Sequence, residues 1–253
     1  MKHQPTAGTR FFFATAPFPC PYLPGRMERR LVAELGGRDS VAFHDTLSLA
    51  GFRRSHRFAY APVCRDCSAC VTVRIVAPDF IPSRTQRRIW QRNQDLTAHE
   101  APARATTEQF LLFQAYQDRR HNGGEMARMD EFDYQALVED TPVDTMIVEF
   151  RDGTGALVGA CIADRLADGV SAVYSFFDPD APRRSLGTYV ILWLVDRARA
   201  MGLRNVYLGF WIADSPKMAY KTRFNPIEAC TPEGWRTLRL DDASVMRHFR
   251  SEH

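Results

Sequence analysis

The second half of the chain contains one long helix that is apolar on almost every side, set among short strand-like runs. This helix is predicted over residues 186–201 and is closed by Gly202. In order, the chain shows strands at 146–150, 157–162 and 170–177, the long helix, a strand at 205–209, a helix at 215–223 and a strand at 235–240. A helix this apolar must be covered on several sides, so the order predicts an α+β fold with a mixed sheet.

Three strands in hairpin sequence, a long helix and a further strand are the order of a GNAT-type acyltransferase core. Residues 11–80 differ in composition, because they are rich in Pro, Cys, Arg and aromatic residues and contain only short apolar runs. We therefore expect a smaller cysteine-containing N-terminal domain over residues 11–98 and a GNAT-type domain over residues 99–250. In the first block, a short helix is predicted at 27–35, and Ser83 is expected to cap a helix that reaches about residue 96.

Composition places the chain among ordinary globular proteins, with 253 residues and a formal net charge of +3. No segment reaches the roughly 18 apolar residues that a membrane helix needs, so we expect a cytoplasmic protein with no membrane partner and no disulfide framework. Lysine occurs only at Lys2, Lys217 and Lys221, and all other basic residues are Arg. The Arg excess is typical of a GC-rich genome, although the guanidinium also pairs well with phosphate and carboxylate.

Three cysteines form a regular cluster, Cys64, Cys67 and Cys70, and Cys20 lies upstream. CxxC spacing suits a metal knuckle, and the four thiolates together would complete a tetrahedral site. Buried free cysteine also packs well as a small apolar residue, and a second CxxC pair is absent from the sequence. A metal at these four residues and purely structural or redox-sensitive thiols both remain open.

The loop before the long helix runs from Arg184 to Tyr189 and partly matches the Q/R-x-x-G-x-G/A loop with which acetyltransferases bind coenzyme A. Arg184 and Gly187 fit the pattern. Tyr189 stands where a small residue is needed, and we expect its ring to hinder a pyrophosphate. The sequence therefore argues against coenzyme A, although an acetyltransferase stays an alternative.

The stretch from Tyr207 to Lys221 joins a strand to a short helix. Lys217 and Lys221 are four residues apart and are expected on one helix face. Tyr220 flanks them, and Trp211 ends the strand. Cations beside aromatic rings suit an RNA 3′ end, because ammonium groups bind phosphate and rings stack on bases. A solvated helix face beside a core tryptophan explains the same pattern.

Two groups of arginines can each be interpreted either as a binding surface or as an ordinary solvated surface. The helix that Ser83 caps carries Arg84, Arg87, Arg88 and Arg92, which suits an RNA backbone or a solvated face. Arg53, Arg54 and Arg57 lie beside His56 and can hold an acidic group, since the guanidinium binds carboxylates through two parallel bonds. A surface patch is the alternative for this second group.

Several separate motifs resemble the arginyl/leucyl-tRNA–protein transferases. In the N-terminal half, the resemblance lies in residues 20–25 (CPYLPG), 51–55 (GFRRS), 60–70 (YAPVCRDCSAC) and 83–88 (SRTQRR). In the C-terminal half, it lies in 174–179 (YSFFDP), 185–187 (SLG) and 209–221. The motifs occur in the right order and cover residues 11 to about 240, and the short length resembles the bacterial branch that transfers leucine.

The resemblance implies an aminoacyltransferase that takes leucine from Leu-tRNA, joins it to the N-terminal Asp or Glu of a protein, and so marks that protein for N-end-rule degradation. It implies no required cofactor and no DNA partner. Trp211, Lys217, Tyr220 and Lys221 are then expected to hold the tRNA 3′ end, Arg53 and Arg54 the acceptor's acidic side chain, and Tyr174 and Asp178 to lie near the reacting carbonyl. Arginine transfer, and a non-catalytic RNA-binding protein, remain the alternatives.

Overall fold

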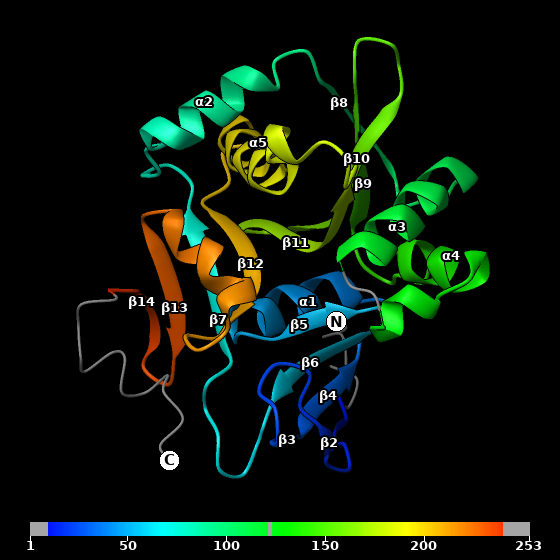
Figure 1. The fold of residues 1–253 in the computed structure, drawn as a ribbon. Helices are drawn as coiled ribbons and strands as arrows, with labels where there is room; N and C mark the ends of the chain where they lie inside the picture. The colour runs from blue at the N-terminus through cyan, green and yellow to red at the C-terminus, as the bar shows by residue number, and fades with distance from the viewer. Residues whose placement is uncertain (1–9, 121–122, 240–253) are drawn as a thin grey trace, which may run out of the picture.

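The computed structural model describes residues 10–120 and 123–239, which form three sheets with helices around them (Figure 1). The largest sheet has eight strands in the order β14-β13-β7-β12-β11-β10-β9-β8. Its strands are β7 (Val71–Val76), β8 (Thr97–Pro102), β9 (Thr145–Arg151), β10 (Leu157–Leu166), β11 (Gly169–Phe177), β12 (Asn205–Trp211), β13 (Ile227–Thr231) and β14 (Gly234–Thr237). The end of the predicted C-terminal domain, residues 240–250, lies outside the described residues.

The sheet is mixed, as the sequence predicts. β9, β10 and β11 pair antiparallel in hairpin order, and β12 pairs parallel to β11 after the helix α5 (Leu186–Ala200) has crossed over. A parallel neighbour requires such a crossover, because a tight turn joins only antiparallel strands. The expected α+β fold with a GNAT-type core is therefore confirmed.

One strand of the large sheet comes from the first part of the chain. β7 lies between β12 and β13 and pairs antiparallel with both. All six of its residues are buried, which suits a strand covered on both faces. The domain boundary at residue 98 stays a prediction, but β7, on its N-terminal side, is an integral part of the sheet that carries the C-terminal half.

Two helices cover one face of the large sheet. α5 lies directly on the sheet, and α2 (Arg84–Arg92) packs over α5 (Figure 1). Because α5 is enclosed between the sheet and α2, it is apolar on nearly all sides, as its sequence indicated. Ser83 closes a capping box with Gln86 at the start of α2, which confirms the predicted cap.

The opposite face is shared by two groups of elements. α3 (Thr107–Arg120) and α4 (Glu131–Glu139) cover β9 to β11 through a second apolar cluster. A short 3-10 turn, η1 (Glu125–Arg128), precedes α4, and Asp130 closes a capping box with Asp133 at the start of α4. The N-terminal sheet and α1 (Ser40–Leu49) lie below β10 to β12, as Figure 1 shows.

The N-terminal sheet has the order β1-β4-β6-β5. Its strands are β1 (Phe12–Ala14), β4 (Arg30–Glu34), β5 (Arg53–Ser55) and β6 (Phe58–Pro62), while β2 (Phe18–Pro19) and β3 (Met27–Glu28) form a separate pair. The helix predicted at 27–35 is therefore wrong. The segment pairs instead with β1 and β6, and these contacts outweigh its local helical preference. α1 and β8 were not predicted, because neither has a clear apolar period.

Candidate functional site

The parallel pair β11 and β12 separates partway along its length. The two strands are paired at Gly169–Asn205, Val170–Val206 and Ser171–Tyr207, and the pairing ends there. Just beyond, β12 bulges against β7, and Gly209 takes a left-handed backbone with φ of 71°. Such a bulge bends the strand and re-aims its polar groups. The backbone carbonyls beyond this point therefore need partners other than strand neighbours.

Two basic side chains supply those partners. The Nζ of Lys221 donates hydrogen bonds to the carbonyl oxygens of Leu208 at 2.8 Å and Phe210 at 2.5 Å on β12. The Nη2 of Arg53 donates to the carbonyl of Val173 on β11 at 3.4 Å. Burial lowers the pKa of Lys221 well below its usual value, and the nearby positive charge of Arg53 lowers it further. Two neighbouring basic side chains thus occupy the gap between the strands.

Arg53 reaches this gap from β5 of the N-terminal sheet. Its guanidinium lies against Gly209, where an added Cβ would come within 2.5 Å of Nε, and it stacks over the ring of Phe210 at 5.4 Å. Glycine is required at 209 both for this close approach and for the positive φ. Within the described residues, the Arg53 guanidinium donates one hydrogen bond, to the carbonyl of Val173. Several of its N–H donors are therefore open to a ligand.

A cleft of about 470 Å³ lies between the end of β11, the N-terminus of α5, the C-terminal end of α3 and the 3-10 helix η3 (Pro216–Arg223). Its apolar lining consists of Tyr116, Phe177, Ala181, Pro182, Leu186 and Ile191. Its charged lining consists of Arg120, Lys217 and Asp178. The first N–H groups of α5 lack helical partners and carry the positive end of the helix dipole, so this end of the cleft favours an anion.

The predicted catalytic pair is separated by the structure. Asp178 lines the cleft, where its Oδ1 accepts a hydrogen bond from the backbone N–H of Asp180 at 2.8 Å. Tyr174 points toward α3, and its hydroxyl accepts a 2.6 Å hydrogen bond from Gln117 Nε2. Burial raises the pKa of Tyr174 to about 12. Tyr174 does not line the cleft, and its hydroxyl keeps its proton at neutral pH.

The predicted RNA-binding group is also divided. Lys217 and Tyr220 line the cleft, but Trp211 is only 3% exposed and belongs to the main apolar core. Lys221 is 6% exposed and bonded to the two carbonyls of β12. The expectation that the two lysines share a helix face is wrong, because the segment is a 3-10 helix, in which residues three apart are aligned.

Arg54, the second residue expected to hold an acidic acceptor, has a different environment. It is 6% exposed and forms a two-bond ion pair with Asp164 on β10, with Nε–Oδ2 at 2.6 Å and Nη2–Oδ1 at 2.8 Å. Its Nη1 donates to the carbonyl of His56. This side chain joins the N-terminal sheet to the large sheet, so we correct its interpretation from substrate contact to buried ion pair.

The loop before α5 corrects another expectation. The ring of Tyr189 is buried and packs on Trp90 at 5.5 Å and Phe150 at 5.7 Å, so it points into the core instead of over the loop. Tyr189 is therefore not the steric obstacle to a pyrophosphate that the sequence predicted. Arg184, the residue that fits the coenzyme A pattern, is instead held in a two-bond ion pair with Asp95.

The cysteine cluster lies apart from the cleft. Burial raises the pKa of Cys70 to about 12, and the neighbouring Cys20, Glu28, Cys67 and Cys64 raise it as well. Within residues 10–120 and 123–239, no group of three or more Cys, His, Asp or Glu is arranged to hold a metal ion. A metal at Cys20, Cys64, Cys67 and Cys70 stays a prediction.

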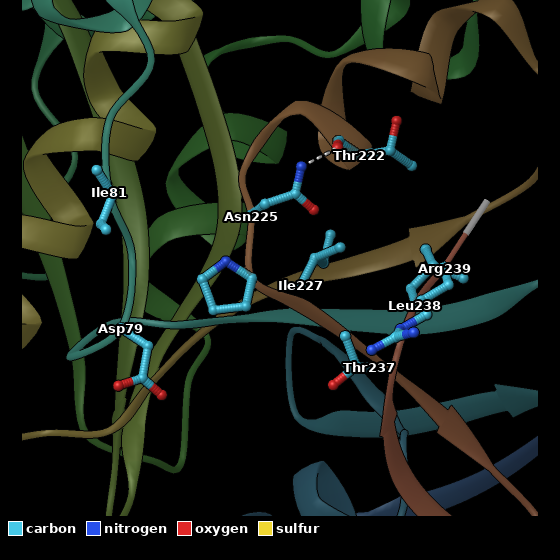
Figure 2. A pocket seen from close by; sticks show the side chains of 9 residues that line it. Asp79, Ile81, Thr222, Asn225, Ile227, Thr237, Leu238 and Arg239 are labelled. Atoms are coloured by element: carbon cyan, nitrogen blue, oxygen red, sulfur yellow. Dashed lines mark hydrogen bonds between the residues drawn. The ribbon is translucent and has the colours of Figure 1, made fainter. Parts of the chain in front are cut away.

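A larger hollow of about 640 Å³ lies elsewhere, beside β13 and β14 (Figure 2). Asp79, Asn225 and Thr237 line it, and Figure 2 shows Asn225 turned toward the backbone of Thr222, to which its amide donates at 3.3 Å. It contains none of the residues predicted from the sequence. The cleft at the N-terminus of α5 is the candidate site, because Asp178, Lys217 and Tyr220 all line it.

Sequence reasoning missed several residues of this site. Tyr116 and Arg120 come from α3, none of whose residues stood out as functional in the sequence. The one available signal was the pair of arginines in its last turn, Arg119 and Arg120, since guanidinium groups bind anions.

The chain matches known proteins over almost its whole length. Residues 18–88 match the family described as "Arginine-tRNA-protein transferase, N terminus", and residues 108–231 match "Arginine-tRNA-protein transferase, C terminus". The chain belongs to this transferase family. An aspartate/glutamate leucyltransferase of Paramagnetospirillum magneticum is 58% identical over 96% of this chain and 100% of the relative. One of Gluconacetobacter diazotrophicus is 54% identical over 92% of this chain and 89% of the relative.

Solved structures show weaker likenesses. FemX matches with a TM-score of 0.46 and 8% identity, over 78% of this chain and 68% of FemX. L-PGS from Bacillus licheniformis matches with a TM-score of 0.45 and 14% identity, over 68% of this chain and 49% of that protein. Both likenesses concern the fold alone. None of the helices in the described part of the chain is long and apolar enough to cross a membrane.

Proposed function

We propose that this family member transfers leucine from Leu-tRNA to the N-terminal Asp or Glu of an acceptor protein. The observation that carries the proposal is the combination of an apolar cleft, cations at its edge, and the Arg53 guanidinium in the neighbouring gap between β11 and β12. The two curated relatives reported above carry the name aspartate/glutamate leucyltransferase, which supports both the donor and the acceptor.

The lining of the cleft favours leucine over arginine as the transferred residue. Phe177, Leu186 and Ile191 present apolar surface on which a leucine side chain is stabilised by burial. Asp178 is the one carboxylate among the described lining residues, and it stands with the cations Arg120 and Lys217. An arginyl donor would place a further positive charge beside these cations, which costs electrostatic energy.

The same cations suit the 3′ end of the tRNA. Lys217 and Arg120 are exposed at the cleft, and the N-terminus of α5 adds partial positive charge. Tyr220 is 40% exposed and offers a ring on which a base can stack. These groups hold the terminal nucleotides while the linked leucine enters the apolar part of the cleft.

Arg53 is the group we assign to the acceptor's acidic side chain. Its Nη2 donates to the carbonyl of Val173 on β11, and two later residues of the same strand, Ser175 and Phe177, line the cleft. Its open N–H donors can form two parallel bonds to a carboxylate. Arg54 has no part in this site, because Asp164 already occupies its guanidinium.

The reaction needs no energy source beyond the aminoacyl ester. The acceptor's α-amine attacks the ester carbonyl, a peptide C–N bond forms, the ester C–O bond breaks, and the tRNA leaves with a free hydroxyl. Free α-amino groups titrate at pKa values of about 7.7–8.0, so a useful fraction of the nucleophile is neutral near pH 7. The protein's main contribution is then to hold amine and ester in reacting geometry. We place the reaction in the cytoplasm, and its outcome is marking for N-end-rule degradation.

Matched peptides test the acceptor side directly. Purified protein is incubated with radiolabelled Leu-tRNA and peptides that differ only in their first residue, Asp against the isosteric Asn and Glu against Gln. The proposal predicts label transfer to the acidic peptides and at least about tenfold less to the amides, because the amides lose the charge-assisted bonds to Arg53. Equal transfer to both would contradict the acceptor assignment, and transfer to none would contradict the proposed function.

A further inference from the structure

Helix α2 carries a row of exposed arginines along one side. Arg84, Arg88 and Arg92 follow one another at four-residue steps, and all three are exposed. Within the described residues none of them takes part in a salt bridge, whereas Arg151, Arg184 and other arginines of the chain are paired with carboxylates. This helix face therefore presents a concentrated positive charge to solvent.

That charge works against the helix that carries it. Like charges four residues apart on a helix destabilise it, because their side chains are neighbours on one face. Arg84 also occupies the first turn, where the helix dipole disfavours a cation. The helix is held by other means, namely its capping box and the bond from Gln86 Nε2 to the carbonyl of Arg223 at 3.1 Å. An unfavourable charge pattern on a well-anchored helix indicates an anionic partner outside the chain.

The row of charges leads to the cleft. Arg92 donates from Nη1 to the carbonyl of Arg183, and Asn93 donates from Nδ2 to the carbonyl of Arg184 at 2.9 Å. Arg183 is itself exposed, and Pro182 and Ser185 on either side of this pair line the cleft. In Figure 1, α2 lies along the outer side of α5. Arg84, Arg88, Arg92 and Arg183, here called the arginine ridge, thus form a continuous path to the edge of the cleft.

We propose that the arginine ridge binds the sugar–phosphate backbone of the tRNA acceptor stem while the 3′ end enters the cleft. The inference rests on the proposed function and adds the surface that receives the donor. Four helical residues advance by about 6 Å, a step comparable to the spacing of phosphates along one strand. The guanidinium forks match phosphate oxygens in geometry and charge.

The composition of the ridge favours a nucleic acid over an acidic protein. The remaining exposed residues of α2 are Thr85, Arg87 and Gln91, all polar, so no exposed apolar residue lies on this helix. The core of a protein–protein interface is enriched in aromatic residues and Met. A phosphate backbone needs only the repeated positive charge, which this helix supplies.

A matched pair of triple variants tests the ridge by binding alone. The variant Arg84→Gln/Arg88→Gln/Arg92→Gln is compared with Arg104→Gln/Arg204→Gln/Arg236→Gln, which removes the same charge from exposed arginines outside the ridge. Affinity for uncharged tRNA is measured between about 50 and 200 mM salt. The ridge variant should bind about ten- to hundredfold more weakly at low salt, with the log–log salt slope smaller by about 2–3, while the control keeps the wild-type values. Equal Kd and slope for the two triples would overturn the proposal.

Transfer kinetics separate the ridge from the reaction itself. With full-length Leu-tRNA, the ridge variant should show a raised KM and an unchanged kcat. With a leucylated CCA trinucleotide, which has no acceptor stem, the ridge variant and wild type should be equal; a KM raised equally for both donors would contradict the assignment. If the wild-type protein transfers leucine from neither donor, the proposed function is contradicted. The binding experiment then still tests whether the arginine ridge binds tRNA.

Discussion

Arg54 and Asp164 form a buried ion pair that connects the N-terminal sheet to the large sheet, with the Arg54 Nε 2.6 Å and Nη2 2.8 Å from the two carboxylate oxygens. Asp164 is completely buried and also accepts a hydrogen bond from the hydroxyl of Thr145 at 2.7 Å. Arg54 belongs to β5 and Asp164 to β10. The pair therefore fixes the sheet that carries Arg53 against the sheet that carries the cleft.

Breaking this pair should destabilise the fold strongly. Arg54→Met leaves the Asp164 carboxylate buried without its countercharge, and Asp164→Leu does the same to the guanidinium, so each change should lower the free energy of unfolding by about 3–5 kcal/mol. The double variant should lose much less than the sum of the two. Unfolding in guanidinium chloride gives the free energy of unfolding of the wild type, the two single variants and the double variant. A loss in the double variant equal to the sum of the two single losses would rule out direct coupling.

His44 should make stability depend on pH. Burial lowers its pKa below the usual 6.5, with Arg54 acting in the same direction and Asp164 and Asp45 opposing. As the pH falls below 6.5, the unfolded chain binds a proton at this residue that the folded chain resists, so stability present above pH 6.5 is lost on acidification. His44→Gln should flatten this part of the curve of unfolding free energy against pH. A curve with the wild-type slope would show that another group is responsible.

Lys221 and Lys217 should behave differently despite their proximity in sequence. Lys221→Met keeps the aliphatic chain but leaves the carbonyls of Leu208 and Phe210 without their donor, so we expect a loss of about 1–3 kcal/mol in stability and a lower kcat. Lys217→Met removes an exposed charge at the cleft, so we expect unchanged stability and a higher KM for Leu-tRNA. Thermal unfolding and steady-state kinetics distinguish the two. Identical effects of both substitutions would indicate that the two lysines share one role and would contradict this assignment.

Arg53 should decide acceptor choice. Arg53→Gln removes the charge that pairs with the acceptor's carboxylate, so kcat/KM for a peptide starting with Asp should fall about ten- to hundredfold. For a peptide starting with Asn, the kcat/KM of the same variant should be close to that of the wild type. The ratio of the two specificity constants is the readout, because a general loss of folding would lower both equally.

The sequence indicated the scaffold better than the site. The buried helix α5 and the cap Ser83 were predicted, because local patterns determine them. Arg53 and Arg54 looked equivalent, yet consecutive residues of a strand face opposite sides, and only the packing of β5 shows which one reaches the gap between β11 and β12. The burial of Lys221 depends on the separation of β11 from β12, a tertiary feature that helical spacing cannot reveal.

The choice of donor remains the most direct test of the whole account. Leu-tRNA and Arg-tRNA, each carrying a different radiolabel, compete in one reaction for a peptide starting with Asp, and the ratio of labels in the product is measured. The apolar cleft predicts that leucine dominates the product by at least about tenfold, as expected when an unpaired charge must enter an apolar site. A product that contains mainly arginine would contradict the assignment of the cleft and of the donor.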